Sequence, residues 1–285
     1  MISNFFKFQK IKKIYETLSK VEKEYGLYYN YLSPINAHWC MKHASIGALG
    51  DSFYEYLLKL WLYENKSNEK TIETYLASID AVRNKMVDVS MGDKLTYIGE
   101  IKSGRLDKKM DHLACFSGGL FALTSISVDS LDENTRKIYL DLAKNITNTC
   151  HESYIRTSSR IGPESFHFER MDQEAMSIKS NEKYYILRPE VIESYFYLWR
   201  TTKDNKYRDW AWDFVLALEK NCKTEHGYSG IKDVYDPYSG KDDVQQSFFF
   251  AETLKYLFLI FSDDSVIPLD KYVFNSEAHP FLIKK

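Results

Sequence analysis

The sequence contains the stretch Leu187-Arg188-Pro189-Glu190-Val191-Ile192-Glu193, which has the features of a helix start. Pro189 suits a first helical turn, because the N–H that proline lacks would have no partner there. Apolar side chains then recur at helical spacing, at Ile192, Tyr195, Phe196 and Trp199. This periodicity predicts a helix that runs from Pro189 and buries one face.

Two carboxylates accompany this helix start. Glu190 and Glu193 are three residues apart and share one face of the first turn, and Arg188 comes just before them. The partial positive charge of a helix N-terminus tolerates negative side chains. The residues alone allow two interpretations: a surface ion pair at an acidic helix start, or a cavity floor whose carboxylates face a substrate or a metal.

Amphipathic segments dominate the rest of the chain and predict a mostly helical, all-α protein. Further helices are expected at Phe8–Val21, from Asp51, at Thr71–Met86, from Met110, at Asn134–Tyr154, at Tyr207–Glu219 and at Val244–Phe261. Gly26–Met41 is expected to be a loop, Leu95–Gly99 a short strand, and Lys271–Pro280 a strand that enters a turn. No repeat or break in composition is visible, so residues 1–285 are expected to form one domain.

The composition is that of a globular protein. Of the 285 residues, 44% are hydrophobic and 27% charged, and the net charge of −2 gives no electrostatic case for binding nucleic acid or an anionic membrane. No apolar run reaches the roughly 18 residues of a membrane helix. Lysines soon interrupt the apolar start of the chain, which is therefore not a secretory signal.

The cysteines and the two glycosylation sequons do not by themselves indicate a metal site or a cellular location. The chain has Cys40, Cys115, Cys150 and Cys222, and no two of them have the spacing of a zinc finger. The sequons Asn65-Lys66-Ser67 and Asn145-Ile146-Thr147 permit a secretory location without requiring one.

Acidic residues recur beside aromatic ones. Asp51 is either a helix cap or a catalytic carboxylate at a helix mouth, and Asp111-His112 more often forms a local hydrogen-bonded pair than a catalytic one. Glu252 follows three phenylalanines and needs water or a partner, because burying an unpaired carboxylate is costly. The oxygen-rich turn Asn275–His279 offers ligands that suit calcium. Together these features fit a glycosidase, which needs two carboxyl groups.

Four stretches, in the same chain order, resemble the class I α-1,2-mannosidases of glycoside hydrolase family 47. They are Gly50–Lys59, Leu187–Ser194, Ser247–Leu257 and Phe274–Pro280. The resemblance runs from about Phe8 to the C-terminus. It implies an (α/α)7 barrel with a C-terminal β-hairpin plug, and inverting hydrolysis of terminal α-1,2-linked mannose from high-mannose N-glycans with one bound Ca²⁺. It also implies a location in the lumen of the Golgi or endoplasmic reticulum. Leu49, two residues before Asp51, is the residue that Golgi-type members have at this position.

The resemblance also implies roles for individual residues. Asp51 matches a general acid candidate and Glu190 the general base. The residues that match sugar-binding positions are Arg188, His112, Leu113, Phe248 and Glu252. For calcium, Ser276 stands where the family has the threonine that binds the ion directly, and Glu193 and Glu277 match residues that act through water. Cys115 and Cys150 match a disulfide, whereas Cys40 and Cys222 match none.

The family domain is substantially longer than this chain. The resemblance therefore implies the C-terminal portion of the catalytic domain, without the early barrel helices, another acid candidate and the N-terminal membrane anchor of a complete parent protein. We expect little or no activity from the isolated chain. In an inverting site the two carboxyl groups are expected to lie roughly 6.5–9.5 Å apart.

Two other readings remain. A non-catalytic protein that binds high-mannose glycans would keep the sugar and calcium residues, although it would have no need of Asp51 and Glu190. An unrelated helical barrel would have to reproduce four ordered motifs by chance.

Overall fold

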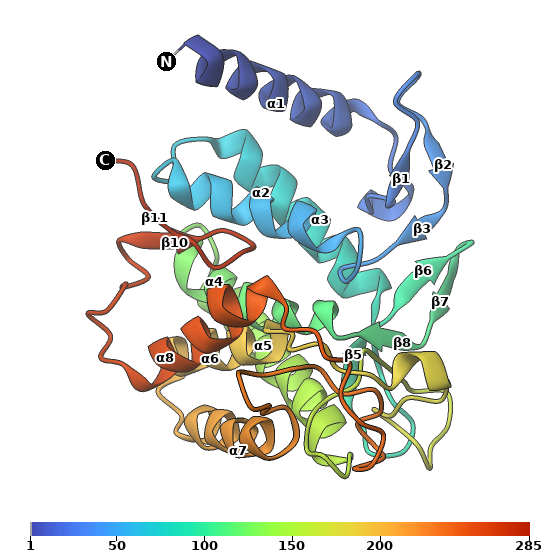
Figure 1. Cartoon of the computed structure of the whole chain (residues 1–285). Helices are drawn as coiled ribbons and strands as arrows, with labels where there is room; N and C mark the ends of the chain where they lie inside the picture. The colour runs from blue at the N-terminus through green and yellow to red at the C-terminus, as the bar shows by residue number, and fades with distance from the viewer. Residues whose placement is uncertain (1) are drawn as a thin grey trace.

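The computed structural model describes residues 2–285, with side chains from residue 10 onward apart from residue 12. Within this range the chain is mostly helical, as the sequence predicts (Figure 1). The α-helices are α1 (Ile2–Lys20), α2 (Asp51–Tyr63), α3 (Glu69–Lys85), α4 (Ser117–Ser127), α5 (Glu133–Ile155), α6 (Glu190–Thr202), α7 (Lys206–Asn221) and α8 (Leu254–Phe261). Shorter helical turns are η1 (Glu24–Gly26), η2 (Leu113–Phe116), η3 (Ser180–Glu182) and the π-helical η4 (Phe249–Thr253).

Short strands are more numerous than the sequence predicts. Within residues 2–285 they form five small antiparallel sheets. The sheets are β1 (Tyr31–Leu32) with β2 (Trp39–Met41), β3 (His43–Ala44) with β6 (Glu100–Lys102) and β7 (Arg105–Asp107), β4 (Val87–Val89) with β5 (Thr96–Ile98), β8 (Lys109–Asp111) with β9 (Ser165–His167), and β10 (Tyr272–Phe274) with β11 (Pro280–Leu282). None of the described helices is long and apolar enough to cross a membrane.

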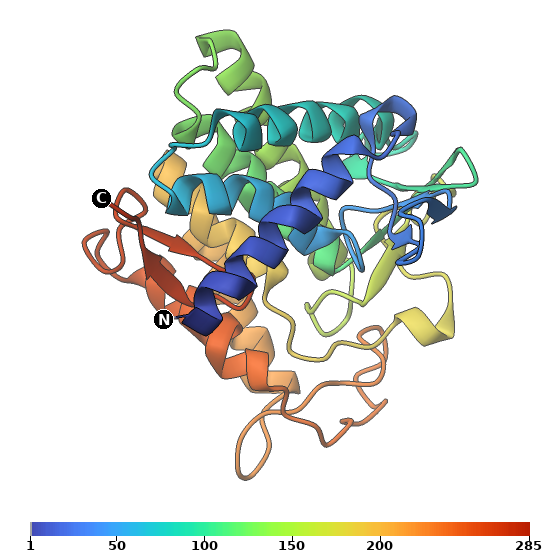
Figure 2. The same ribbon diagram turned by 90° about the horizontal axis from the view of Figure 1, so that it is seen from above.

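The helices pack around α4 and α6. α4 contacts α5 and α6, and α6 in turn contacts α7 and α8. α1 lies across α2 and α3 on one side of the molecule, and the β10–β11 hairpin lies beside α2 (Figures 1 and 2). The buried apolar side chains of the other helices form one cluster, and the partly buried Tyr15 and Leu18 of α1 pack against it.

Two glycines allow α4 to approach its neighbours closely. A Cβ at Gly118 would lie 2.1 Å from Oγ1 of Thr147 on α5, and a Cβ at Gly119 would lie 2.7 Å from the ring of Tyr197 on α6. Real side chains do not tolerate such distances, so only glycine fits at these two positions. Ser194 of α6 strengthens the contact, since its hydroxyl accepts the N–H of Gly119.

The helix predicted from Pro189 is present as α6. Glu190 is its first residue, and the apolar side chains of Ile192, Tyr195 and Phe196 are buried. α6 ends at Lys203, which adopts a left-handed conformation and donates its N–H to the carbonyl of Trp199.

Three local predictions were wrong. The helix expected from Met110 begins only at Leu113, because Met110 lies in β8 and pairs with Phe166 of β9. The helix expected from Val244 begins near Ser247, and its first turns are π-helical. The expected loop Gly26–Met41 contains the β1–β2 ribbon. The first predicted helix coincides largely with α1, but the side chain of Phe8 lies outside those described.

Cys115 and Cys150 form a disulfide with their Cα atoms 6.0 Å apart, as the family resemblance implies. The bond joins η2, at the start of α4, to α5. Cys40 and Cys222 are free, and Cys222 is buried.

We expect the double substitution Cys115→Ala and Cys150→Ala to lower the free energy of unfolding. The bridge closes a segment with a sequence separation of 35 residues, and its loss restores freedom to the unfolded chain worth about 3–4 kcal/mol. Urea unfolding of the 285-residue chain measures the change. Cys40→Ser removes an exposed free thiol and is the matched control. Equal unfolding midpoints for the double variant and the control would contradict the prediction.

Candidate active site

A pocket of about 290 Å³ lies where the N-terminal ends of α2 and α6 meet η2, η4 and the turn between β10 and β11. Nine residues that the sequence singles out line it: Asp51, Leu113, Arg188, Glu190, Glu193, Phe248, Glu252, Ser276 and Glu277. Ser52, Glu55, Phe116 and Pro189 complete the lining. The pocket therefore collects side chains from all four motif stretches.

Glu190 is held as a carboxylate from behind the pocket. Its Oε2 lies 2.7 Å from Nδ1 of His112, and Nε2 of His112 lies 2.6 Å from Oη of Tyr154. When the Tyr154 hydroxyl donates to Nε2, Nδ1 carries the hydrogen and donates to Glu190. Burial raises the pKa of the Glu190 carboxyl, but the hydrogen bond from His112 and the electrostatic attraction of His112 and Arg188 outweigh it, so the pKa is lower than usual. Glu190 is thus ionised near neutral pH, which is the form that a general base needs.

His112 acts on this site through Glu190, since it is only 1% exposed and does not line the pocket. Its backbone N–H donates to the carbonyl of Glu164, which precedes β9.

Glu164 is a site residue that the sequence reasoning missed. It forms a bidentate ion pair with Arg188, with distances of 2.6 and 2.7 Å from Nε and Nη2 to the two carboxylate oxygens. Such a fork is a strong and directional contact. The backbone before Arg188 is also held, because Leu187 has a left-handed φ of 68° and its carbonyl accepts the hydroxyl of Thr253. Arg188 is therefore held at its guanidinium by Glu164 and at its preceding backbone by Thr253.

Asp51 is the first residue of α2 and faces the pocket from the opposite helix. Its Oδ1 accepts the N–H of Ser52 at 2.7 Å. Burial, with smaller contributions from the nearby carboxylates of Asp111, Glu55 and Glu190, raises its pKa to about 6. Asp51 is thus partly protonated near neutral pH, as a general acid requires.

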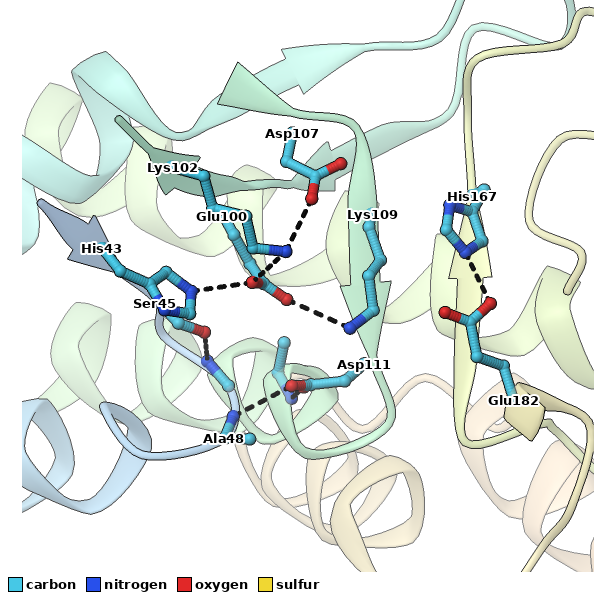
Figure 3. Close-up of polar contacts among 12 residues, drawn as sticks. His43, Ser45, Ala48, Glu100, Lys102, Asp107, Lys109, Asp111, His167 and Glu182 are labelled. Carbon is cyan, nitrogen blue, oxygen red and sulfur yellow. Dashed lines mark hydrogen bonds and ion pairs between the residues drawn. The ribbon is translucent and has the colours of Figure 1, made fainter. Parts of the chain in front are cut away.

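Asp111, at the end of β8, ties the two sides of the pocket together. Its Oδ2 accepts the N–H of Ala48, in the loop before Asp51 (Figure 3). Its Oδ1 accepts the N–H of Ala114, in the turn after His112. The side chain is almost fully buried. One carboxylate therefore sets the distance between the segment that carries Asp51 and the segment that carries His112.

A charged cluster supports the strand that leads into this loop. Glu100 of β6 lies 2.9 Å from Nε2 of His43 on β3, 2.9 Å from Nζ of Lys102 and 3.4 Å from Nζ of Lys109 on β8 (Figure 3). These contacts fasten β3 to β6 and β8 just before the chain turns toward Asp51.

We expect Gly47→Ala to destabilise the protein by about 1–3 kcal/mol through overpacking. The new Cβ would lie 2.1 Å from Oδ1 of Asp111, which cannot move without losing its two buried hydrogen bonds. Chemical unfolding provides the measurement. In an Asp111→Ala background the clash is gone, so Gly47→Ala should cost less there. An equal cost in both backgrounds would show that Asp111 is not the obstacle.

A buried lysine lies beneath the carboxylates of the pocket. Lys59 of α2 is 4% exposed, forms an ion pair with Glu55 one turn earlier, and has its Nζ 3.6 Å from Oε1 of Glu193. Glu193 also accepts the hydroxyl of Tyr256. The sequence reasoning missed Glu55, although its spacing of four residues from Asp51 places both on one face of α2 and could have indicated it.

The pocket has more negative charge than its cations offset. Burial, together with the carboxylates of Glu193, Glu190, Glu277 and Glu55, raises the pKa of the Glu252 carboxyl to about 9. Close by, Oγ of Ser276 lies 2.9 Å from Oη of Tyr56. In the described part of the chain no group of three or more His, Cys, Asp or Glu side chains is arranged to hold a metal ion.

The sequence model of glycosyl hydrolase family 47 matches residues 5–283. The chain belongs to this family. It is 55% identical over 276 residues to mannosyl-oligosaccharide alpha-1,2-mannosidase IA of Drosophila melanogaster, and 51% identical over 272 residues to mannosyl-oligosaccharide 1,2-alpha-mannosidase IC of Homo sapiens. Among solved structures, the alpha-1,2-mannosidase from Trichoderma reesei superimposes with a TM-score of 0.83 at 30% identity.

These alignments cover nearly all of this family 47 chain but only part of its relatives. They include 97% and 95% of the chain, but 41% of the Drosophila protein and 42% of the human one. The structural match includes 94% of the chain and 59% of the Trichoderma chain. The chain thus spans about two fifths of the length of the curated relatives it matches.

Proposed function

We propose that this family 47 chain carries the general base and a general acid candidate of a site that hydrolyses terminal α-1,2-linked mannose of high-mannose N-glycans with inversion. The main support for the proposal is a pair of carboxyl groups in one pocket whose surroundings shift their pKa values in opposite directions. The pKa of Glu190 is lowered and that of Asp51 is raised to about 6. Such a divergence marks a base and an acid.

In the proposed reaction, Glu190 accepts a proton from the water that attacks C1 of the terminal mannose. Asp51 donates a proton to the departing glycosidic oxygen as the C1–O bond breaks. The water needs room between the two carboxyl groups, which in inverting enzymes lie roughly 6.5–9.5 Å apart. His112 keeps Glu190 oriented, and Arg188 is held by Glu164 at the pocket edge. Leu113, Phe248 and Glu252, which also line the pocket, are proposed to contact the sugar.

Calcium fits the residues present. The hydroxyl of Ser276 is a hard oxygen donor, and the raised pKa of Glu252 reflects negative charge that a divalent cation would offset. We propose that Ser276 would bind the ion directly, with Glu193 and Glu277 acting through water. This arrangement needs no cage of direct carboxylate ligands. When bound, calcium would supply positive charge to the pocket.

We also make a proposal about the arrangement of the helices and of the C-terminal hairpin. We propose that residues 1–285 form one domain, that the helices belong to an (α/α)7 barrel, and that β10–β11 closes one of its ends. The match to the Trichoderma structure and the place of Ser276 in the hairpin turn support this. We propose that the protein is located in the lumen of the Golgi or endoplasmic reticulum. The disulfide supports this location, because such bonds form there. Membrane attachment is proposed to occur through another part of a longer protein.

Release of free mannose from a high-mannose glycan tests the function. We expect it from a longer protein that contains this chain, and proton NMR should show the β-anomer first, because inversion of an α-linkage gives it. We propose that the 285 residues alone release little or none, since part of the Trichoderma chain has no counterpart here. Glycan binding by the longer protein without release would favour the lectin alternative.

A further inference from the structure

The two sequons lie in different structural settings. Asn65-Lys66-Ser67 forms the exposed turn between α2 and α3, whereas Asn145-Ile146-Thr147 lies within α5. A glycosylated sequon belongs in a surface loop, where a bulky solvated group can be accommodated. The structure can therefore distinguish between them.

Asn65 ends α2 in a conformation that turns its side chain outward. The N–H of Lys66 donates to the carbonyl of Trp61 at 2.8 Å, and the N–H of Asn65 donates to the carbonyl of Leu62 at 3.0 Å. This pair of bonds is a Schellman motif with Asn65 at the left-handed position, where its φ is 52°. The backbone is thus fixed while the side chain stays in solvent.

The two side chains that define the sequon, Asn65 and Ser67, have no structural task, whereas Lys66 between them forms an ion pair with Asp129. In the described part of the chain, neither the Asn65 amide nor the Ser67 hydroxyl makes a side-chain hydrogen bond, whereas the next residue, Asn68, caps α3 by accepting the N–H of Thr71. The left-handed position explains an asparagine at 65, but nothing in the fold requires the hydroxyl at 67.

The second sequon is closed by packing. Asn145 is exposed, but Ile146 and Thr147 are fully buried, and Oγ1 of Thr147 lies against Gly118 of α4. Its hydroxyl is out of reach in the folded chain.

The exposed sequon is also far from the pocket. Asp51 begins α2 and Asn65 follows its end, so the 13 residues of the helix separate them by roughly 20 Å. A bulky group on Asn65 would leave the pocket open.

We propose that Asn65, in preference to Asn145, is an N-glycosylation site of this protein. The inference rests on the lumenal location given under the proposed function. The donor would be an oligosaccharide linked through pyrophosphate to a lipid. Nδ2 of Asn65 forms a bond to C1 of the first sugar, the C1–O bond to phosphate breaks, the lipid pyrophosphate leaves with the electron pair, and the amide loses one proton.

The test is to direct the full 285-residue chain into the secretory pathway of an insect cell with a cleavable leader. A glycan on the purified protein is detected as added mass that an enzyme specific for asparagine-linked glycans removes. Two variants remove the acceptor without disturbing the fold. Asn65→Gly keeps the left-handed position, which glycine favours, and Ser67→Ala removes only the unused hydroxyl. Asn145→Gln is the matched control.

We expect one added glycan in the wild type and in Asn145→Gln, and none in Asn65→Gly or Ser67→Ala. A wild-type chain that reaches the lumen without added mass would overturn the proposal. So would a glycan that survives Ser67→Ala, or full occupancy of both sequons. Because the readout is mass, a protein without mannosidase activity would still show the modification, so the two proposals fail separately.

Discussion

Glu190→Gln should reduce mannose release by about 10²–10⁴-fold, the usual contribution of a general base. Glutamine keeps the length and shape of the side chain but cannot accept the proton of the attacking water. The loss should appear in kcat, with little change in KM, because Arg188, Phe248 and Glu252, which we propose contact the sugar, are untouched. The measurement belongs in a longer protein that contains this chain, where we propose that the site is complete.

The 285-residue chain provides a separate control for folding. Its unfolding midpoint should fall modestly in Glu190→Gln. The amide oxygen can still accept from Nδ1 of His112, but the variant loses the stabilisation that goes with the lowered pKa of Glu190. Glu133→Gln, at the exposed start of α5, is the matched variant for activity and should turn over normally. Unchanged mannose release by Glu190→Gln would contradict the assignment of Glu190 as the general base.

The residues around Glu190 show what a sequence can predict. Pro189 and the apolar periodicity are local features, and they located the start of α6. The paired carboxylates allowed either a surface ion pair or a cavity floor, and in the structure both Glu190 and Glu193 line the pocket. The family motifs then added distant residues such as Asp51 and Ser276, which the structure brings to the same pocket. Local pattern identified the helices, and only the resemblance related them to one site.

The misses share a physical cause. Glu164 supports the site by pairing with Arg188, 24 residues away. No local sequence pattern predicts such a contact. The sequence predicts a helix from Met110, but pairing with Phe166 makes this residue part of a strand. Strands of two or three residues are too short for a visible alternation. What decided these positions was tertiary contact, which outweighs local propensity.

Asp51→Asn should have opposite effects on activity and stability. Asp51 has a pKa raised to about 6, so the fraction able to donate a proton falls as the pH rises through that value. Mannose release by the longer wild-type protein should therefore decline on the alkaline side of about pH 6. In Asp51→Asn the rate should drop by about 10²–10⁴-fold, and this limb of the pH profile should disappear. A limb that persists would assign the acid to another residue.

The stability effect follows from the same raised pKa and can be measured in the 285-residue chain. A carboxyl whose pKa is higher in the folded state stabilises that state below its unfolded pKa, near 4, and this contribution is lost as the pH rises through about 6. At pH 8 the wild type keeps an ionised, half-buried carboxylate that asparagine lacks. Relative to wild type, Asp51→Asn should thus be more stable at pH 8 than at pH 3, by about 1–3 kcal/mol. Asp141→Asn, exposed on α5, is the matched control and should show no such difference. If urea unfolding gave Asp51→Asn the same relative stability at both pH values, the environment of Asp51 would not favour its protonated form, and its role as the acid would lose its physical basis.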